Sequence, residues 1–123
     1  MQILNAIGNG VRADASSGPV DVELHDATVD GASGGSAIVV LSPTSGGPTA
    51  RILADHVTST NNAGYGLRAA GGTASLYLRN SVSEDNGVGL AATNGGQIFS
   101  YGDNTVANNT GGAGATPTAL PSE

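Results

Sequence analysis

Two histidine–carboxylate pairs are the residues of this 123-residue chain best suited to acid–base chemistry. His25 precedes Asp26, and His56 follows Asp55. A carboxylate that orients an imidazole can make a general base or half of a metal site. Neighbours along a strand, however, point to opposite faces, so we expect neither pair to act as a unit and His56 to occupy an exposed position.

Arg12 and Arg68 are candidate ligands for an anion. Each follows an apolar residue in a Gly-Val-Arg-Ala or Gly-Leu-Arg-Ala segment, so both are expected to project outward from one face. Two steps of a parallel ladder span about 10 Å, a spacing at which two guanidinium groups could clamp a carboxylated sugar. A solvated face or ion pairs at an interface are the alternatives. A separate ion pair is expected between Arg79 and Asp103.

Three tyrosines, Tyr65, Tyr77 and Tyr101, are candidates for an aromatic platform under sugar rings. Tyr77 and Tyr101 each lie five residues before a repeated valine, which predicts that they stack on one another. Simple packing is the alternative. Together with the groups above, the candidate ligand-binding residues are Arg12, Arg68, Tyr65, Tyr77, Tyr101, Asp55 and His56.

The remaining carboxylates predict no metal site. Calcium requires about 6 to 8 converging oxygens, and Asp30, Glu84, Asp85 and Asp103 do not follow the spacing of a calcium loop. The chain has no cysteine, which removes disulfides, thiolate ligands and cysteine nucleophiles. We therefore expect no metal, no cofactor and no catalytic residue.

The charge balance limits the partners. Four arginines and ten carboxylates give a formal net charge of −6, so an electrostatic grip on a nucleic-acid backbone is not expected. No run approaches the roughly 18 apolar residues of a membrane span, and the first residues lack the basic and apolar regions of a signal peptide. Neither membrane nor nucleic acid is a predicted partner, and the compartment is undetermined.

A repeat supplies the elements that would position these side chains. Two sets of apolar residues recur with spacings of 28, 25 and 24 and of 28, 28 and 23 residues: Val29, Val57, Val82 and Val106, and Val11, Val39, Leu67 and Leu90. Between them apolar and polar residues alternate as in short strands, for example from Val20 to Leu24. Segments rich in Gly, Asn and Asp separate the strands, and no segment has helical periodicity.

Stacking would turn equivalent positions into ladders. The four valines of the first set are expected to form one apolar column. In the position directly before each valine, His56 stands where the other repeats have Thr28, Ser81 and Thr105. Two sets of polar residues are expected to hydrogen-bond to adjacent turns. The first set lies two places before the valines and contains Asp55, Asn80 and Asn104. The second set lies at the following corners and contains Asn62, Asn86 and Asn109.

Segments such as residues 78–90 and 103–109 resemble coils of the right-handed parallel β-helix, the pectate-lyase-like superfamily. The resemblance covers about residues 9–109. It implies an all-β, single-stranded solenoid of about four coils with 23–28 residues per coil. It implies no activity, because no lysine is present to act as a lyase base and His25 and His56 do not stand in a Gly-His-Gly motif.

The predicted domain covers residues 1–110, and residues 111–123 form a Gly/Ala/Pro-rich tail that we expect to be partly disordered. Met1 lies only ten residues before Val11, so the first coil is expected to expose unpaired strand edges. Either an upstream segment or a homodimer would cover them.

The sequence therefore predicts a non-catalytic structural or interaction module that associates with itself through an uncapped coil end. A carbohydrate-binding module, with a polysaccharide as partner, is the first alternative. A reduced polysaccharide lyase or hydrolase is the second, in which Asp55, His56 or Arg68 would lie in the site.

Overall fold

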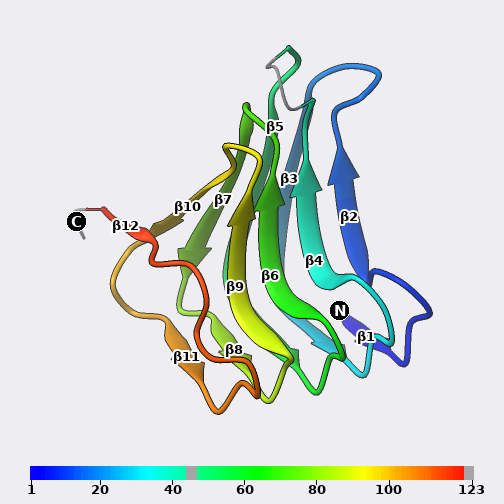
Figure 1. The fold of residues 1–123 in the computed structure, drawn as a ribbon, viewed down its shortest axis with the longest axis vertical. Helices are drawn as coiled ribbons and strands as arrows, with labels where there is room; N and C mark the ends of the chain where they lie inside the picture. Colours follow the sequence, from blue (N-terminus) through cyan, green and yellow to red (C-terminus); the bar gives the residue numbers. More distant parts are fainter. Residues whose placement is uncertain (44–46, 121–123) are drawn as a thin grey trace.

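The computed structural model describes residues 1–43 and 47–120, and every regular element in this part of the chain is a β-strand (Figure 1). The strands are β1 (Gln2–Leu4), β2 (Val11–Asp14), β3 (Val20–Asp30), β4 (Ser36–Leu41), β5 (Ala50–Thr60), β6 (Tyr65–Ala70), β7 (Ala74–Arg79), β8 (Val82–Glu84), β9 (Val88–Thr93), β10 (Gln97–Ser100), β11 (Thr105–Ala107) and β12 (Thr118–Ala119).

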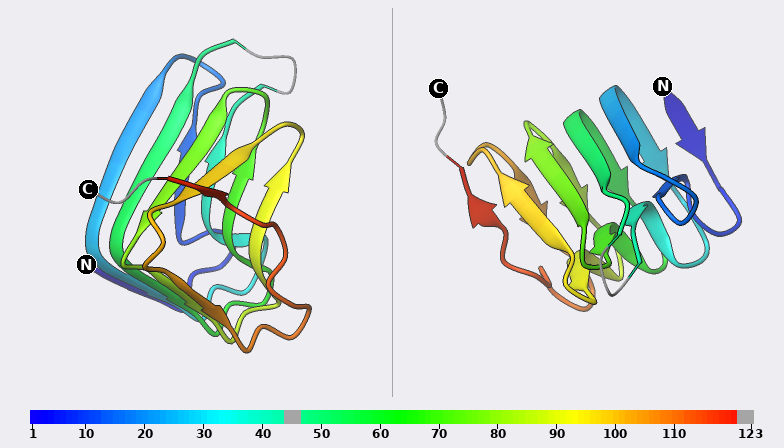
Figure 2. Two further views of the ribbon diagram at one scale, coloured as in Figure 1. Left: turned by 90° about the vertical axis from the view of Figure 1, so that its left-hand side faces the viewer. Right: turned by 90° about the horizontal axis from the view of Figure 1, so that it is seen from above.

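All the strand pairs are parallel and belong to two sheets. One sheet has the order β2-β4-β6-β9. The other has the order β1-β3-β5-β7-β10-β12, and β8 pairs with both β5 and β11. The predicted all-β class is confirmed, with parallel strands and no helix among the described residues, and this arrangement is compatible with a β-solenoid. Seen along the stacking direction, the strands form walls around a narrow interior (Figure 2).

Left-handed residues make two of the corners between walls. At one corner Asp26, His56 and Asn80 have φ of 54°, 56° and 48°. This corner divides β3 and β5 internally, so that the first half of β5 pairs with β7 and the second half with β8. At the next corner the left-handed residues are Asn61, Asp85 and Asn108, with Gly31 before them. Asn, Asp and Gly tolerate this backbone better than other residues, which explains their abundance in the chain.

The repeated valines do not form one column, which corrects the sequence alignment. Val29 is paired with Ser59, and Ser83 with Val106, so Val29 and Val106 share an inward column with two serines. Val57 is paired with Ala27, two residue positions before Val29. Val82 lies in an outward column with Thr28, Thr58 and Thr105. In the second set the sequence alignment placed one residue wrongly, because Ile38 and not Val39 is paired with Val11 and Leu67.

The buried asparagines form the predicted ladder. Asn62 Oδ1 accepts a hydrogen bond from the Ala32 amide at 2.8 Å, Asn86 Oδ1 accepts from the Asn62 amide at 3.1 Å, and Asn109 Oδ1 accepts from the Asn86 amide at 2.9 Å. The Nδ2 groups of Asn62 and Asn86 donate to the hydroxyls of Ser59 and Ser83 within the same coil. These bonds satisfy backbone groups that the corner removes from the sheets.

Of the second expected ladder, Asp55, Asn80 and Asn104, only Asn104 acts through its side chain as predicted, because Asn80 contributes its backbone amide and Asn104 bonds to Ser81. Asn104 Oδ1 accepts from the Ser81 amide, and Asp103 Oδ1 accepts from the Asn80 amide. Asp55, however, is paired with Arg79 and not with Asn80.

The interior is thin and is filled largely by alanine, valine, leucine and isoleucine. Gly66 faces the column that contains Ser83, and a Cβ added to it would collide with Ser83 Oγ and with Asn86 Nδ2 at 2.5 Å. Small residues are therefore required wherever one wall approaches the asparagine corner. This explains how a chain with few large apolar residues can still close a dry core.

The two ends of the stack differ. At the end formed by β1 and β2, four apolar residues of the core are only partly buried: Ile3, Val11, Val20 and Val22. At the other end residues 111–120 pass over the last strands. Gly114 bridges Leu90, β12 pairs with β10, and the Leu120 amide donates to Ser100. Residues 121–123 of the expected tail lie outside the described part of the chain.

Replacing the middle asparagine of the ladder tests its role. Asn86→Ala leaves the buried Asn62 amide and the Ser59 carbonyl without partners, so we expect a loss of about 3 kcal/mol in the free energy of unfolding. The matched control is Asn61→Gly, which keeps the left-handed corner and should change stability by less than about 0.5 kcal/mol. Urea denaturation measures both, and equal losses would show that the ladder has no special role.

Candidate functional site

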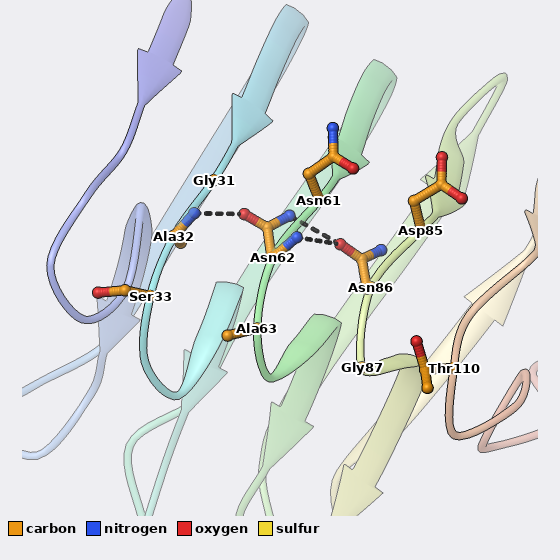
Figure 3. A pocket seen from close by; sticks show the side chains of 10 residues that line it. All are labelled: Gly31, Ala32, Ser33, Asn61, Asn62, Ala63, Asp85, Asn86, Gly87 and Thr110. Atoms are coloured by element: carbon orange, nitrogen blue, oxygen red, sulfur yellow. Dashed lines mark hydrogen bonds between the residues drawn. The ribbon is translucent and has the colours of Figure 1, made fainter.

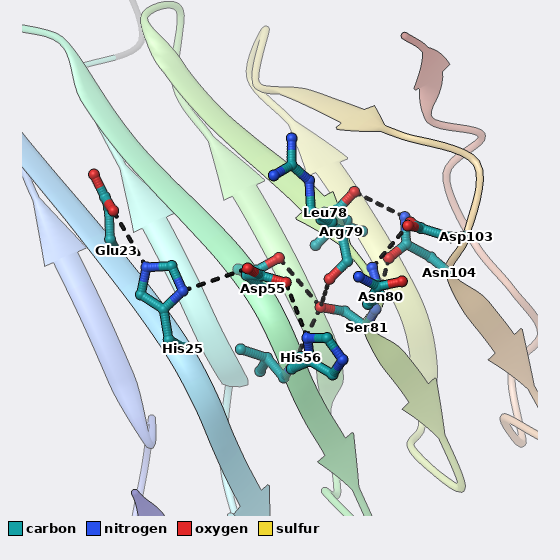
Figure 4. Close-up of polar contacts among 12 residues, drawn as sticks. Glu23, His25, Asp55, His56, Leu78, Arg79, Asn80, Ser81, Asp103 and Asn104 are labelled. Carbon is teal, nitrogen blue, oxygen red and sulfur yellow. Dashed lines mark hydrogen bonds and ion pairs between the residues drawn. The ribbon is translucent and has the colours of Figure 1, made fainter. Parts of the chain in front are cut away.

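Two histidines and two carboxylates meet on the outer surface where β3 and β5 bend (Figure 4). His25 Nε2 lies 3.2 Å from Glu23 Oε1, and its Nδ1 lies 3.4 Å from Asp55 Oδ2. His56 Nδ1 lies 3.1 Å from the other oxygen of the same carboxylate, Asp55 Oδ1. Asp55 is thus held between two imidazoles, and its side chain is the least exposed of the four.

The left-handed backbone at His56 explains why Asp55 and His56 meet. In a regular strand the two side chains would point to opposite faces, as the sequence argument assumed. The φ of 56° at His56 breaks that alternation, so its ring returns to the side of Asp55. His56 therefore corresponds to Asp26 and Asn80 and not to Thr28. Its exposed position was predicted correctly, with 62% of its side chain accessible.

The surrounding carboxylates raise the pKa of His25. The hydrogen bond with Glu23 has the largest effect, desolvation opposes it, and Asp55 adds a further upward contribution. His25 consequently keeps its proton to a higher pH than an isolated histidine. A protonated His25 between two carboxylates binds β3 to β5 electrostatically at this corner.

Arg12 and Arg68 share one column, as predicted, with Val39 between them. They do not act on one ligand in this structure, because each has its own partner. Arg12 Nη2 lies 2.8 Å from Asp14 Oδ2. Hydrogen bonds from the Ser16 hydroxyl and amide, with a smaller effect of Arg12, lower the pKa of Asp14 to about 2.

Arg68 belongs to a different cluster. Its guanidinium carbon lies 5.4 Å from the centre of the Tyr65 ring, and its Nε and Nη2 donate to Thr93 Oγ1 at 3.3 and 3.2 Å. A rearrangement of both arginines would be needed before they could clamp one carboxylate.

The tyrosines do not form the expected stack. Tyr77 stacks on Phe99, with ring centroids 4.8 Å apart and planes inclined by 19°. Tyr101 lies instead beneath Arg79, whose guanidinium carbon is 4.4 Å from the ring centre. Arg79 therefore contacts an aromatic ring, and the expected pair with Asp103 is not among the ion pairs of the described residues.

The error in the tyrosine alignment has a simple origin. β7 and β10 are displaced by 22 residues, since Tyr77 is paired with Phe99. β8 and β11 are displaced by 23 residues, since Val82 is paired with Thr105. Val106 is paired with Ser83 and not with Val82, so the valines are misaligned by one residue, and the corner after β10 adds a second residue. An alignment on the valines therefore carries Tyr101 instead of Phe99 into the column. Alignment of Ser75–Leu78 with Gln97–Ser100 would have identified Phe99.

Arg51 completes an aromatic–guanidinium surface that the sequence argument missed. Its guanidinium carbon lies 5.2 Å from the Tyr77 ring centre, and its Nη1 lies 3.4 Å from Asp21 Oδ2. A concavity of about 440 Å³ adjoins it, lined by residues that include Pro19, Val20 and Thr73. The outer face of β3, β5, β7 and β10 thus combines π faces, positive charge and hydroxyl groups.

A larger open groove of about 590 Å³ follows the asparagine corner (Figure 3). The side chains of Asn61 and Asp85 point away from the ladder, while the amides of Asn62 and Asn86 are engaged in it. Glycine and alanine form much of the remaining lining. The groove follows from the close approach of successive backbones, and its polar groups do not converge on one point.

Among the described residues, no group of three or more His, Cys, Asp or Glu side chains is arranged to hold a metal ion. Within residues 1–43 and 47–120, no helix is long and apolar enough to cross a membrane. Comparison with known proteins gives no match to a family, to a curated protein or to a solved structure.

The charge of His25 can be tested by an NMR titration of its imidazole. We expect a raised pKa, which Glu23→Gln lowers most and Asp55→Asn lowers less. Glu84→Gln, a carboxylate at another corner, serves as the control. Because the folded pKa is raised, protonation of His25 stabilises the fold below its ordinary pKa, and this contribution is lost as pH rises through the folded value. A pKa at or below the ordinary value would contradict the proposed ion pairs.

Proposed function

We propose that the chain is a right-handed parallel β-helix of about four coils, similar to the pectate-lyase-like superfamily, that serves as a non-catalytic structural or interaction module. We propose further that it forms a homodimer through the end of the stack that contains β1 and β2. The difference between the two ends of the core is the observation that carries this proposal.

Exposed apolar side chains support the choice of end. Met1, Leu4 and Ile7 are the large hydrophobic residues with high exposure among the described residues, at 60%, 55% and 96%. Met1 directly precedes β1, Leu4 is the last residue of β1, and Ile7 lies in the segment that follows it. Ile3 and Val11, in the terminal strands β1 and β2, are only partly buried, so this end presents more apolar surface to water than the middle of the stack does.

Open strand edges at the same end offer backbone hydrogen bonds to a second chain. β1 and β2 are terminal strands of their sheets, and each has a neighbour on one side only in the described residues. Unpaired edges favour pairing with another chain. A two-fold axis, the commonest symmetry of small oligomers, would bring the same edges of two copies together.

The opposite end favours a closed dimer over a filament. There the segment before β12 crosses the last strands, with the Ala115 amide bonded to Leu90, and Ala115 and Val106 are the partly buried core residues. At this end β11 pairs only with β8 in the described residues and keeps one open edge, whereas β9 and β10 are covered. A head-to-head contact through the β1 and β2 end would therefore join more unpaired strands than a head-to-tail contact.

Ile7→Lys tests the dimer. Ile7 is almost fully exposed, so the substitution should not affect folding, but it would place a charge in the interface. We expect a dimer for the unmodified chain and roughly 100-fold weaker association for Ile7→Lys, since two symmetry-related side chains each lose about 1.5 kcal/mol of burial. Thr105→Lys at the covered end is the matched control. Light scattering over a concentration series measures the mass, and a monomer at all concentrations would contradict the proposal.

Carbohydrate binding is the second candidate, and the Arg51–Tyr77–Phe99 arrangement favours it. Two stacked rings beside a guanidinium and a hydroxyl-lined concavity offer both a flat face and hydrogen-bonding groups to a sugar. Arg12 and Arg68, the first candidates from sequence, are occupied by Asp14 and Thr93.

A uronic-acid tetrasaccharide is the probe for this second candidate. If the surface binds it, Tyr77→Leu and Arg51→Ala should each weaken binding at least about 10-fold, because they remove a π face or a charged donor. Arg12→Ala should leave binding unchanged. Calorimetric titration measures all four proteins, and loss of binding in Arg12→Ala alone would place the site elsewhere.

A further inference from the structure

The first half of β3 has an open edge that is distinct from the edges of β1 and β2. β1 pairs only with Thr28–Asp30, the second half of β3. Residues Val20–His25 pair with β5 on one side, and on the other side no strand lies beside them in the described residues. The edge is six residues long and is recessed beside β1, which adds one more strand along the second half of β3.

The backbone alternation identifies the unpaired groups on this edge. The Val20 amide donates to the Thr49 carbonyl, so the backbone groups of Val20, Val22 and Leu24 face β5. Those of Asp21, Glu23 and His25 face the opposite side. Three N–H and three C=O groups are therefore available to an added strand.

The inward side chains along this edge lack the cover that the next strand has. Val22 is only partly buried, whereas Ile52, its partner on β5, is 0% exposed. An added strand with apolar residues at alternate positions would extend the core columns that contain Val20, Val22 and Leu24. The edge therefore selects for the two-residue period of a half-buried strand.

The outward side chains along this edge indicate which charges an added strand should carry. Asp21 and Glu23 point outward with 62% and 59% of their side chains exposed, and the nearest positive groups, on Arg51 and His25, lie at 3.4 and 3.2 Å. Like charges on directly opposed residues destabilise a strand pair, so a second copy of this acidic segment is a poor occupant. Basic residues on an added strand would be favoured.

We propose that the recessed edge of Val20–His25 binds an extended segment of another protein as an added strand, and that this segment alternates apolar with basic residues. Backbone hydrogen bonds supply the affinity, and the alternating side chains supply the specificity. This binding is separate from the proposed self-association and does not require it, because the edge belongs to the first half of β3 and not to β1 or β2.

An NMR titration with the capped hexapeptide Val-Lys-Val-Lys-Val-Thr tests the proposal. We expect saturable changes centred on the amides of Asp21, Glu23 and His25. The peptide Val-Glu-Val-Glu-Val-Thr should bind at least about 10-fold more weakly, because it places like charges beside Asp21 and Glu23. Absence of binding, or equal binding of the two peptides, would overturn the proposal.

Glu23→Pro is the decisive variant. The Glu23 amide faces the open side, so proline removes a donor from the edge while the bonds of Val22 and Leu24 to β5 remain. We expect at least 10-fold weaker binding of the lysine peptide, against a loss of about threefold for Glu23→Gln. The melting temperature of both variants verifies that they are folded, and unchanged binding to folded Glu23→Pro would refute strand addition.

The mass of each variant separates this inference from the proposed dimer. If the unmodified chain is a monomer that binds the lysine peptide, the strand-addition site stands and the dimer fails. If Glu23→Pro converts a dimer into a monomer, the occupant of the edge is a second copy and the peptide proposal is wrong.

Discussion

Asparagine side chains at one corner carry hydrogen bonds between successive passes of the chain, and the rest of the structure depends on them. A corner takes backbone amides out of the sheets, and in a dry interior each unpaired amide would be costly. Asn62, Asn86 and Asn109 each accept from a backbone amide of the preceding pass. Because these bonds fix the position of each pass, small side chains are sufficient to fill the space between walls, and Gly66 can lie directly against Ser83.

A stack that is built in this way has ends, and the ends determine how the molecule meets other molecules. Residues 111–120 cover part of one end, through β12 on β10 and the bridge to Leu90 on β9. The other end leaves apolar side chains and backbone groups without neighbours. Its surface is uneven, because β1 adds a strand beside the second half of β3 and none lies beside the first half in the described residues. The exposed Ile7 motivates the proposed dimer, and the exposed carboxylates Asp21 and Glu23 motivate the proposed basic strand.

The same left-handed corners also arrange the outer surface. The bend at His56 brings its ring to Asp55 and, through that carboxylate, into contact with the His25–Glu23 pair. The flat part of the same wall carries Tyr77 on Phe99, with Arg51 above the ring. Both clusters are exposed and lack an enclosed cleft that would exclude water from a reaction.

The sequence by itself determined the parallel all-β class and the asparagine ladder, because both follow from local chemistry: alternation of apolar residues, and Asn at a fixed place after each strand. It also placed Arg12 and Arg68 in one column. It failed at alignments that cross a corner, since one extra residue between β10 and β11 and the one-residue misalignment of Val82 with Val106 together placed Tyr101 opposite Tyr77, where the structure has Phe99. The meeting of Asp55 with His56 and His25 was likewise decided only by the tertiary structure. A left-handed φ at one residue changes the side to which its own side chain points relative to the residue before it, and the residue types alone do not reveal at which position the backbone makes that turn.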